Sequence, residues 1–401
     1  LDIPRNWDAI SSAKIRDRRD TNTRAKVKFR KSDKISTYLF SFVTGRFNRV
    51  EKRVGNLQMT MLHREFDKAK ARRNVSEIFE LHKSAIEYME DYTGIEFPFQ
   101  KFAFVLIPSF QFGGMEHVGA IQYKASTLML EKSSSTNERL ARAALIGHET
   151  AHMWFGDLVT MDWFNDVWTK EVFANFMSAK LVNPGFPDIN HELRSHLNLH
   201  PRAYSVDRTE GPNPIRQELP NLNEAGTMYG AIIYNKAPIM MQQLELLIGE
   251  QAFQEGVREY LNSFAFSNAT WDDLINILDK KSDRDLKRWS EVWVNTPGRP
   301  TFSVTEELGK GLMLEQSDPL MRERRWPQSF NVRKGAVPYN VSYSTNAINL
   351  DDIGNNGDSK LLINSNGMGY GLFPISKAYI RSNWEELDDL ERASGFVTLY
   401  E

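Results

Sequence analysis

Polar and apolar residues alternate in short stretches near the beginning of the chain. Residues 24–30 (Arg-Ala-Lys-Val-Lys-Phe-Arg) follow the period of a half-buried β-strand. A second strand is predicted over residues 36–43, and the turn residues Thr44 and Gly45 end it. The first part of the chain is therefore expected to contain short β-strands.

Helical periodicity takes over after this region. Apolar residues recur at steps of three and four between Ile78 and Tyr92, and Gly94 supplies a stop signal. A strand is predicted over residues 102–107, where the run is continuously apolar and Pro108 follows. Ser135 and Glu138 have the spacing of a capping box, which predicts a helix that continues to about residue 155. Further helices are expected near residues 172–181, 238–247, 253–264 and 271–278.

The pattern changes again after the turn-forming run Asn295-Thr296-Pro297-Gly298. Short apolar runs alternate with Gly, Asn and Asp turns, which is typical of a small antiparallel sandwich. These runs cover residues 301–305, 311–315, 339–343 and 360–363. Residues 384–401 predict a single helix. We expect an α+β protein in which helices dominate before residue 295 and strands follow it.

Composition narrows the choice of partners and chemistry. At roughly 150 residues per domain, a chain of 401 residues is expected to form two or three domains. Its 50 basic and 52 acidic residues argue against nucleic acid as the main partner, because phosphate binding needs a basic excess. Without cysteine, a metal must be held by His, Asp and Glu. No apolar run is long enough to predict a membrane span. The first residues lack the layout of a signal peptide, and we expect a segment of a longer protein.

The run His148-Glu149-Thr150-Ala151-His152 lies inside the capped helix. Its i, i+4 spacing places both imidazoles on one helix face, where they can share a cation. A run of this type arises by chance in about 2% of chains with this composition. Without a third ligand, two histidines on an ordinary helix face would be the simpler interpretation.

Glu171 is the candidate third ligand. A catalytic zinc needs three protein ligands and one open position. Gly156 ends the first helix, and residues 162–165 give the chain room to turn back. A second helix can then present Glu171, which lies between apolar stretches, to both histidines. The alternative is a surface glutamate. Asn175, one turn further on, is a candidate hydrogen-bond partner for a ligating histidine.

These residues resemble a known family. His148-Glu149-x-x-His152, followed after 18 residues by Glu171, is similar to the zinc aminopeptidases of the aminopeptidase N and leukotriene hydrolase type, which are gluzincin metallopeptidases. Residues 154–160 and 361–371 resemble further segments of that family. Gly113-Gly114-Met115-Glu116-His117 is similar to its Gly-x-Met-Glu-Asn motif, and Tyr234-Asn235-Lys236-Ala237 is similar to its Tyr-x-Lys-Gly motif.

The sequence departs from the family pattern at four positions. His117 replaces the usual Asn, Lys170 and Val172 replace the usual Asn and Gly beside the third ligand, and Ala237 replaces Gly. None of these changes removes a metal-ligating or proton-transferring group.

The resemblance implies a fold and a domain order. We expect a thermolysin-like zinc catalytic domain over residues 46–294, followed by a small antiparallel β-sandwich over residues 295–383. Residues 1–45 would be the remnant of an N-terminal β domain, and residues 384–401 the first helix of a C-terminal helical domain. Most of both flanking domains would thus be missing.

The resemblance also implies a reaction, namely hydrolysis of the N-terminal residue of peptides. One zinc ion would be held by His148, His152 and Glu171. Glu149 would act as general base towards the zinc-bound water, and Tyr234 would donate to the oxyanion. The substrate N-terminus would bind at Gly113, Gly114, Met115 and Glu116.

Glu116 determines the class of peptidase. A free peptide N-terminus has a pKa of about 8 and is mostly an ammonium ion at neutral pH. An internal peptide bond would leave a buried carboxylate unpaired, at a cost of about 3–5 kcal/mol. A carboxylate at this position therefore favours removal of one residue from peptides with a free N-terminus.

Two other functions stay open for this fold. One is epoxide hydrolysis on the same zinc, as in the leukotriene hydrolase relative. The other is a non-catalytic peptide-binding scaffold. Scaffolds of this kind lose metal ligands, whereas here His148, His152, Glu171 and Glu149 are all present.

Overall fold

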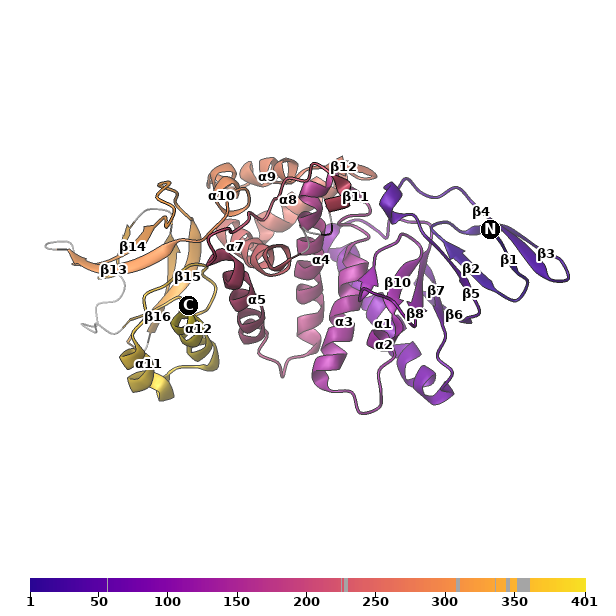
Figure 1. Ribbon diagram of the computed structural model, residues 1–401, viewed down its shortest axis with the longest axis horizontal. Coiled ribbons are helices and arrows are strands. Elements are labelled where there is room, and N and C mark those ends of the chain that lie inside the picture. The colour runs from indigo at the N-terminus through magenta and orange to yellow at the C-terminus, as the bar shows by residue number, and fades with distance from the viewer. Residues whose placement is uncertain are drawn as a thin grey trace. The chain divides into compact units, whose positions relative to one another are not determined.

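The computed structural model describes residues 1–55, 57–224, 226, 230–307, 311–335, 337–343, 347–351 and 361–401. The chain forms two compact units. Unit 1 comprises Leu1–Asp162, Thr169–Phe186 and Val257–Thr270, and unit 2 comprises Trp163–Trp168, Pro187–Gly256 and Trp271–Glu401. Both units combine helices with small sheets, which confirms the α+β class (Figure 1). The expected domain boundaries stay a prediction.

Short strands begin unit 1, in two small antiparallel sheets. The first has the order β1-β4-β3 and the second pairs β2 with β5. Their bounds are β1 (Asp2–Pro4), β2 (Asp8–Ser11), β3 (Ile15–Asp20), β4 (Arg24–Phe29) and β5 (Phe42–Gly45). The strand predicted over residues 24–30 is confirmed. Of the strand predicted over residues 36–43, only Phe42 and Val43 lie in a strand, β5, which also includes Thr44 and Gly45. The earlier part is wrong, because Leu39 and Phe40 donate to the carbonyls of Ser36 and Thr37 and close a 3-10 turn (Thr37–Leu39).

A five-stranded sheet forms the centre of unit 1. Its order is β6-β7-β8-β10-β9, with the central pairs parallel and the outer pairs antiparallel. The strands are β6 (Asn48–Val54), β7 (Leu57–His63), β8 (Phe102–Ile107), β9 (Gly114–Met115) and β10 (Ile121–Lys124). Val105 packs towards Ile10 of β2, whereas Phe104 contacts Phe79 and His82 of helix α1 (Lys68–Thr93). β8 is continuously apolar because it is buried on both faces.

Four helices complete most of unit 1. Besides α1 they are α2 (Ala125–Leu128), α3 (Thr136–Ala151) and α4 (Val167–Val182), and the short strands β11 (Val159–Met161) and β12 (Ser267–Ala269) pair in parallel. α1 begins ten residues before the predicted apolar run, because the Asp67 side chain caps it by accepting from Ala69 and Lys70. It ends at Gly94, as predicted, with φ of 69°.

Unit 2 contains the remaining helices and the β-rich region. Before the β-rich region, the described residues of unit 2 contain α5 (His191–Asp207), α7 (Ala237–Ile248), α9 (Trp271–Asp279) and α10 (Leu286–Trp293); α8 (Glu250–Ser263) begins in unit 2 and ends in unit 1. The helices predicted near residues 238–247, 253–264 and 271–278 are confirmed within a few residues. A π-helical segment, Ile232–Lys236, precedes α7.

Two three-stranded antiparallel sheets share one apolar core in the C-terminal part of unit 2. One has the order β13-β14-β17, with β13 (Thr301–Glu307), β14 (Gly311–Ser317) and β17 (Ala347–Asn349). The other has the order β16-β15-β18, with β15 (Gln328–Lys334), β16 (Val337–Tyr343) and β18 (Leu361–Ile363). The predicted apolar runs all fall in these strands, except that residue 360 lies outside the described residues. Phe302, Phe330 and Phe373 fill the core between the sheets.

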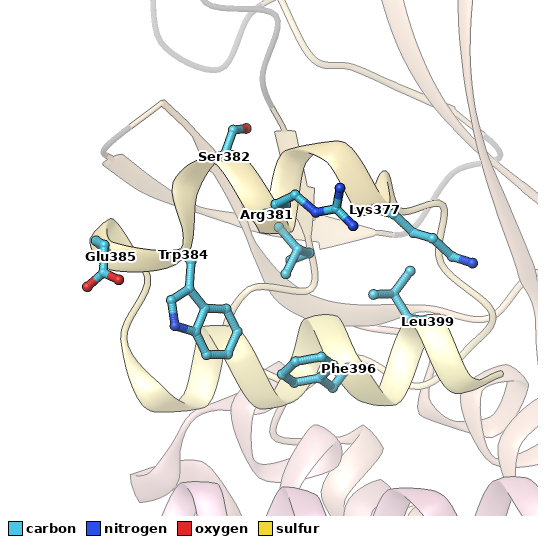
Figure 2. A pocket seen from close by; sticks show the side chains of 8 residues that line it. Lys377, Arg381, Ser382, Trp384, Glu385, Phe396 and Leu399 are labelled. Atoms are coloured by element: carbon cyan, nitrogen blue, oxygen red, sulfur yellow. The ribbon is translucent and has the colours of Figure 1, made fainter.

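The helix predicted over residues 384–401 is present but begins five residues later, and a further helix that was not predicted precedes it. α11 (Lys377–Asn383) is followed by a 3-10 turn (Trp384–Glu386) and by α12 (Asp389–Tyr400). α12 begins as a separate helix because Asp388 and Glu391 form a capping box at its start. A hollow of about 530 Å³ lies between α11 and α12, beside Trp384 and Phe396 (Figure 2). It contains none of the predicted site residues. No helix in the described part of the chain is both long and apolar enough to span a membrane.

Candidate active site

Helix α3 carries the two predicted histidine ligands. Its predicted capping box is present: the Ser135 hydroxyl accepts from the Glu138 backbone N–H at 3.2 Å, and the Glu138 carboxylate accepts from the Ser135 N–H at 2.7 Å. The helix ends four residues earlier than predicted. His148 therefore lies in its last turn, and His152 is the residue that directly follows it.

Helix α4 presents Glu171 to the same histidines. The Ser178 hydroxyl of α4 donates to the Ala144 carbonyl of α3 at 2.7 Å. The rings of Phe155 and Phe173 stack at a centroid distance of 4.4 Å, which ties the residues after α3 to α4. These contacts hold the two helices in the arrangement that the site requires.

The three candidate ligands converge inside unit 1. The Nε2 atoms of His148 and His152 lie 3.0 Å apart. Glu171 Oε2 lies 3.5 Å from His148 Nε2 and 3.9 Å from His152 Nε2. Glu171 is buried, so it is not a surface glutamate. The three side chains thus offer two nitrogens and one oxygen within 4.8 Å of one another.

The other nitrogen of each ring has its own partner. His148 Nδ1 lies 3.0 Å from Asn175 Oδ1, and His152 Nδ1 lies 2.9 Å from the Phe155 carbonyl oxygen. When Nδ1–H donates to these oxygens, both neutral rings present Nε2 lone pairs to each other and to a carboxylate. A cation between the three groups would stabilise this arrangement, and the donor set fits a metal ion.

Glu149 lies beside this cluster and against strand β9. It is 3% exposed, and its Oε2 atom has no hydrogen-bond partner among the described residues. A Cβ added to Gly114 would lie 2.2 Å from Glu149 Oε1. Only glycine therefore allows β9 to approach the carboxylate this closely.

Glu116 directly follows β9 and is 3% exposed. Its Oε1 atom accepts from the Lys170 ammonium at 2.5 Å. Glu116, Glu149 and His152 also bring ligand atoms within 4.8 Å of one another, so the amine-binding candidate adjoins the metal candidate. Met115 pairs with Gln122 of β10, while Gly113 immediately precedes the strand and accepts through its carbonyl from the Lys124 N–H.

Burial and neighbouring charges shift the pKa values of the site residues. Burial raises the pKa of Glu149 to about 8. Burial also acts to raise the pKa of Glu116, but the Lys170 ammonium outweighs it and lowers that pKa to about 2. For His148, burial opposes the charged form, but the contact with Glu171 prevails and raises the pKa to about 9. Glu149 is thus the group that exchanges a proton most readily near neutral pH.

Comparison with known proteins identifies the family. The family model described as "Peptidase family M1 domain" matches residues 77–293, which is more than half of the chain. The chain belongs to peptidase family M1. This confirms the resemblance inferred from the sequence motifs, and with it the class of aminopeptidase-type metallopeptidases.

Several curated proteins are similar to this chain, and most of those described here are named as aminopeptidases. A probable aminopeptidase 2 of Sulfurisphaera tokodaii is 31% identical over 78% of this chain and 40% of its own length. The aminopeptidase N of Streptomyces lividans is 30% identical over 74% of this chain and 34% of its own length. The tricorn protease-interacting factor F2 of Thermoplasma acidophilum is 28% identical over 99% of this chain and 50% of its own length. The chain thus spans half or less of the length of these M1 relatives.

Tyr234 belongs to unit 2, in the π-helical segment, and its side chain is partly exposed. Its role in this M1 chain stays a prediction. The neighbouring Lys236 is fully buried and donates to Asp207 Oδ2 at 2.7 Å and to the Gly298 carbonyl at 2.8 Å. This pair anchors the segment that carries Tyr234.

Sequence reasoning missed three groups around the M1 site. Lys170 was noted only as a departure from the family pattern, although its position in an apolar helix was a signal. Asp157 is buried, with neither carboxylate oxygen bonded among the described residues, and burial raises its pKa. Tyr38 places its ring 5.7 Å from the Lys170 Nζ atom. No local pattern pointed to Tyr38, because it lies far from α4 in the sequence.

Proposed function

We propose that this chain is the catalytic part of a zinc aminopeptidase that hydrolyses the N-terminal residue of peptides. The observation that carries this proposal is the convergence of His148, His152 and Glu171 beside the buried carboxylate of Glu149. The aminopeptidase names of the M1 relatives support the same reaction. The proposal includes a thermolysin-like catalytic domain over residues 46–294, with an N-terminal remnant, a sandwich over 295–383 and a final helical segment.

His148, His152 and Glu171 would hold a single zinc ion. Two imidazole nitrogens and one carboxylate are a donor set typical of catalytic zinc, and Asn175 and Phe155 fix the orientation of the two rings. When bound, the metal supplies a Lewis acid and lowers the pKa of a coordinated water to about 7.

Glu149 is the proton-transfer group in this proposal. Its Oε2 atom is buried and accepts no hydrogen bond within the described chain, so it is available to take a proton from water and pass it to the leaving amine. Burial raises its pKa, which makes the carboxylate a stronger base. Gly114 lets β9 approach this carboxylate closely.

Glu116 would receive the α-ammonium group of the substrate. Its carboxylate is buried and its pKa is lowered, so it stays charged at neutral pH. Gly114 and Met115 form the edge strand β9 and Gly113 directly precedes it, so an extended peptide can approach the backbone closely here. Tyr234 would donate to the oxyanion, and its place in a π-helical segment supports a functional role.

Substitution of Glu149 by Gln tests the reaction. We expect the variant to keep its zinc while kcat on an aminoacyl-arylamide falls by about 10²- to 10⁴-fold, since the general base is lost. Metal analysis and steady-state kinetics measure both quantities, and the exposed Glu87→Gln is the matched control. Unchanged turnover would end the proposal.

Substitution of Glu116 by Ala tests the site of amine recognition. We expect kcat/KM for free-amine substrates to fall by about 10- to 100-fold, because a charge-assisted contact is lost. Cleavage of the N-acylated analogue, already poor, should change little. Equal losses for both substrates would remove Glu116 from the amine site.

A further inference from the structure

Lys170 is a buried lysine that contacts two of the carboxylates in the site. Its side chain is 7% exposed. The ammonium group donates to Glu116 Oε1 at 2.5 Å and to Glu171 Oε1 at 2.8 Å. One flexible cation therefore joins a residue that follows strand β9 to a residue of helix α4.

The two carboxylate oxygens of Glu171 have different partners. Oε1 accepts from Lys170, while Oε2 faces the Nε2 atoms of His148 and His152. The position of Lys170 therefore fixes which carboxylate oxygen is offered to a metal. Any change in how strongly Lys170 binds Glu171 changes the charge that this ligand presents.

Glu116 competes for the same ammonium group. It and Glu171 are both buried, and like charges placed together in a low-dielectric site repel each other. Lys170 balances both, and removal of either carboxylate strengthens the attraction of the ammonium group to the other. The Tyr38 ring lies 5.7 Å from Nζ, beside the cation.

We propose that Lys170 is a positioning residue that couples amine recognition at Glu116 to metal binding at Glu171. The inference rests on the proposed function, since it assigns those two roles to the two carboxylates. The coupling is specific to a cation at this position. A neutral residue such as asparagine, usual in the family, can hold a carboxylate by hydrogen bonding but has no charge to share.

The test is a double-mutant cycle on zinc affinity, measured by competition with a chelator and without any substrate. Glu116→Gln is made in three backgrounds: Lys170, Lys170→Arg and Lys170→Asn. In the Lys170 background, Glu116→Gln removes one carboxylate contact of the ammonium group, strengthens its attraction to Glu171 and weakens zinc binding. We expect this effect to be about tenfold larger with Lys170 than with Asn, since contacting charged groups are strongly non-additive.

The arginine background separates coupling from a merely structural role. Arginine keeps the charge, so it should retain most of the non-additivity even if its absolute zinc affinity differs. Should Lys170→Arg fail to fold, comparison of Lys170 with Lys170→Asn still decides the question. An equal effect of Glu116→Gln in the charged and neutral backgrounds would overturn the coupling.

Failure of the proposed coupling through Lys170 can be distinguished from failure of the proposed aminopeptidase function. If the wild-type chain binds no zinc, or if Glu149→Gln keeps full turnover, the aminopeptidase proposal fails first. If zinc binds and Glu149 is needed but the cycle is additive, only the role of Lys170 is wrong.

Discussion

The molecule contains two histidine pairs with the same helical spacing but different surroundings. His148 and His152 lie at the end of α3 in unit 1, and His196 and His200 lie on α5 in unit 2. The ring centroids are 4.6 Å apart in the first pair and 4.4 Å apart in the second. The i, i+4 spacing thus brings two imidazoles together in both units, whatever they do there.

The partners of the rings separate the two pairs. In the first pair, the Nε2 atoms face each other and the Glu171 carboxylate. In the second, His196 Nδ1 and His200 Nε2 contact the carbonyl oxygens of Gly367 and Gly369. Among the described residues, the candidate metal groups include the first pair and not the second. The Glu171 carboxylate, which faces both Nε2 atoms of the first pair, makes the difference, and spacing alone does not.

The largest expected effect comes from removing one histidine of each pair. His152→Ala should release the metal and lower turnover by about 10³-fold or more, because the site loses a ligand and several kcal/mol of charge stabilisation. His200→Ala should keep one zinc per chain and change mainly the stability of unit 2. Metal content and kcat measured on both variants test the contrast. Loss of zinc from His200→Ala would remove the distinction between the pairs.

The sequence predicted elements well where local signals sufficed. β8 has the predicted bounds, because a continuous apolar run ends at Pro108. The start of α3 was predicted from Ser135 and Glu138, whose capping is local chemistry. The spacing of Glu171 from His152 predicted that they meet, and the structure brings them together, although their roles stay predictions.

The errors arose where non-local or competing local contacts decide the structure. Residues 36–43 carry the composition of a strand, but backbone bonds close a turn at Thr37–Leu39. The bridge from Lys170 to Glu116 depends on how α4 meets β9, 54 residues apart in the chain. The sequence does not single out the second histidine pair, because its partners are backbone carbonyl groups, and these give no recognisable residue pattern in the sequence.

Asn175→Ala should weaken zinc binding by about 10- to 100-fold. The substitution removes the oxygen 3.0 Å from His148 Nδ1, so this ring loses its fixed tautomer and orientation. Chelator competition measures the effect. Asn198→Ala is the matched control, because Asn198 is exposed between the two histidines of the second pair. Equal zinc affinities in both variants would show that Asn175 does not orient the ligand.

Gly367→Ala should disturb the second pair alone. Gly367 has φ of +63°, and an added Cβ would lie 2.7 Å from His196 Nδ1. We expect unit 2 to lose about 1–2 kcal/mol of stability from backbone strain and the crowded contact. Urea unfolding followed by tryptophan fluorescence measures this loss, and zinc content should stay at the wild-type level. A wild-type unfolding midpoint would contradict the tight contact between this turn and His196.

The smallest expected effect is a pH dependence carried by the second pair. Burial lowers the pKa of His196 to about 4, and burial also lowers the pKa of His200, which faces His196, Tyr204 and Tyr370, well below its ordinary value. The fold therefore favours neutral rings, and stability falls as pH drops below the unfolded pKa of about 6.5. Between pH 7 and pH 6, His196 alone should cost about 0.7 kcal/mol. His196→Gln removes this titration, so its loss of stability over that interval should be smaller than that of the wild type. An identical loss in both proteins would mean that His196 is already solvated in the folded state.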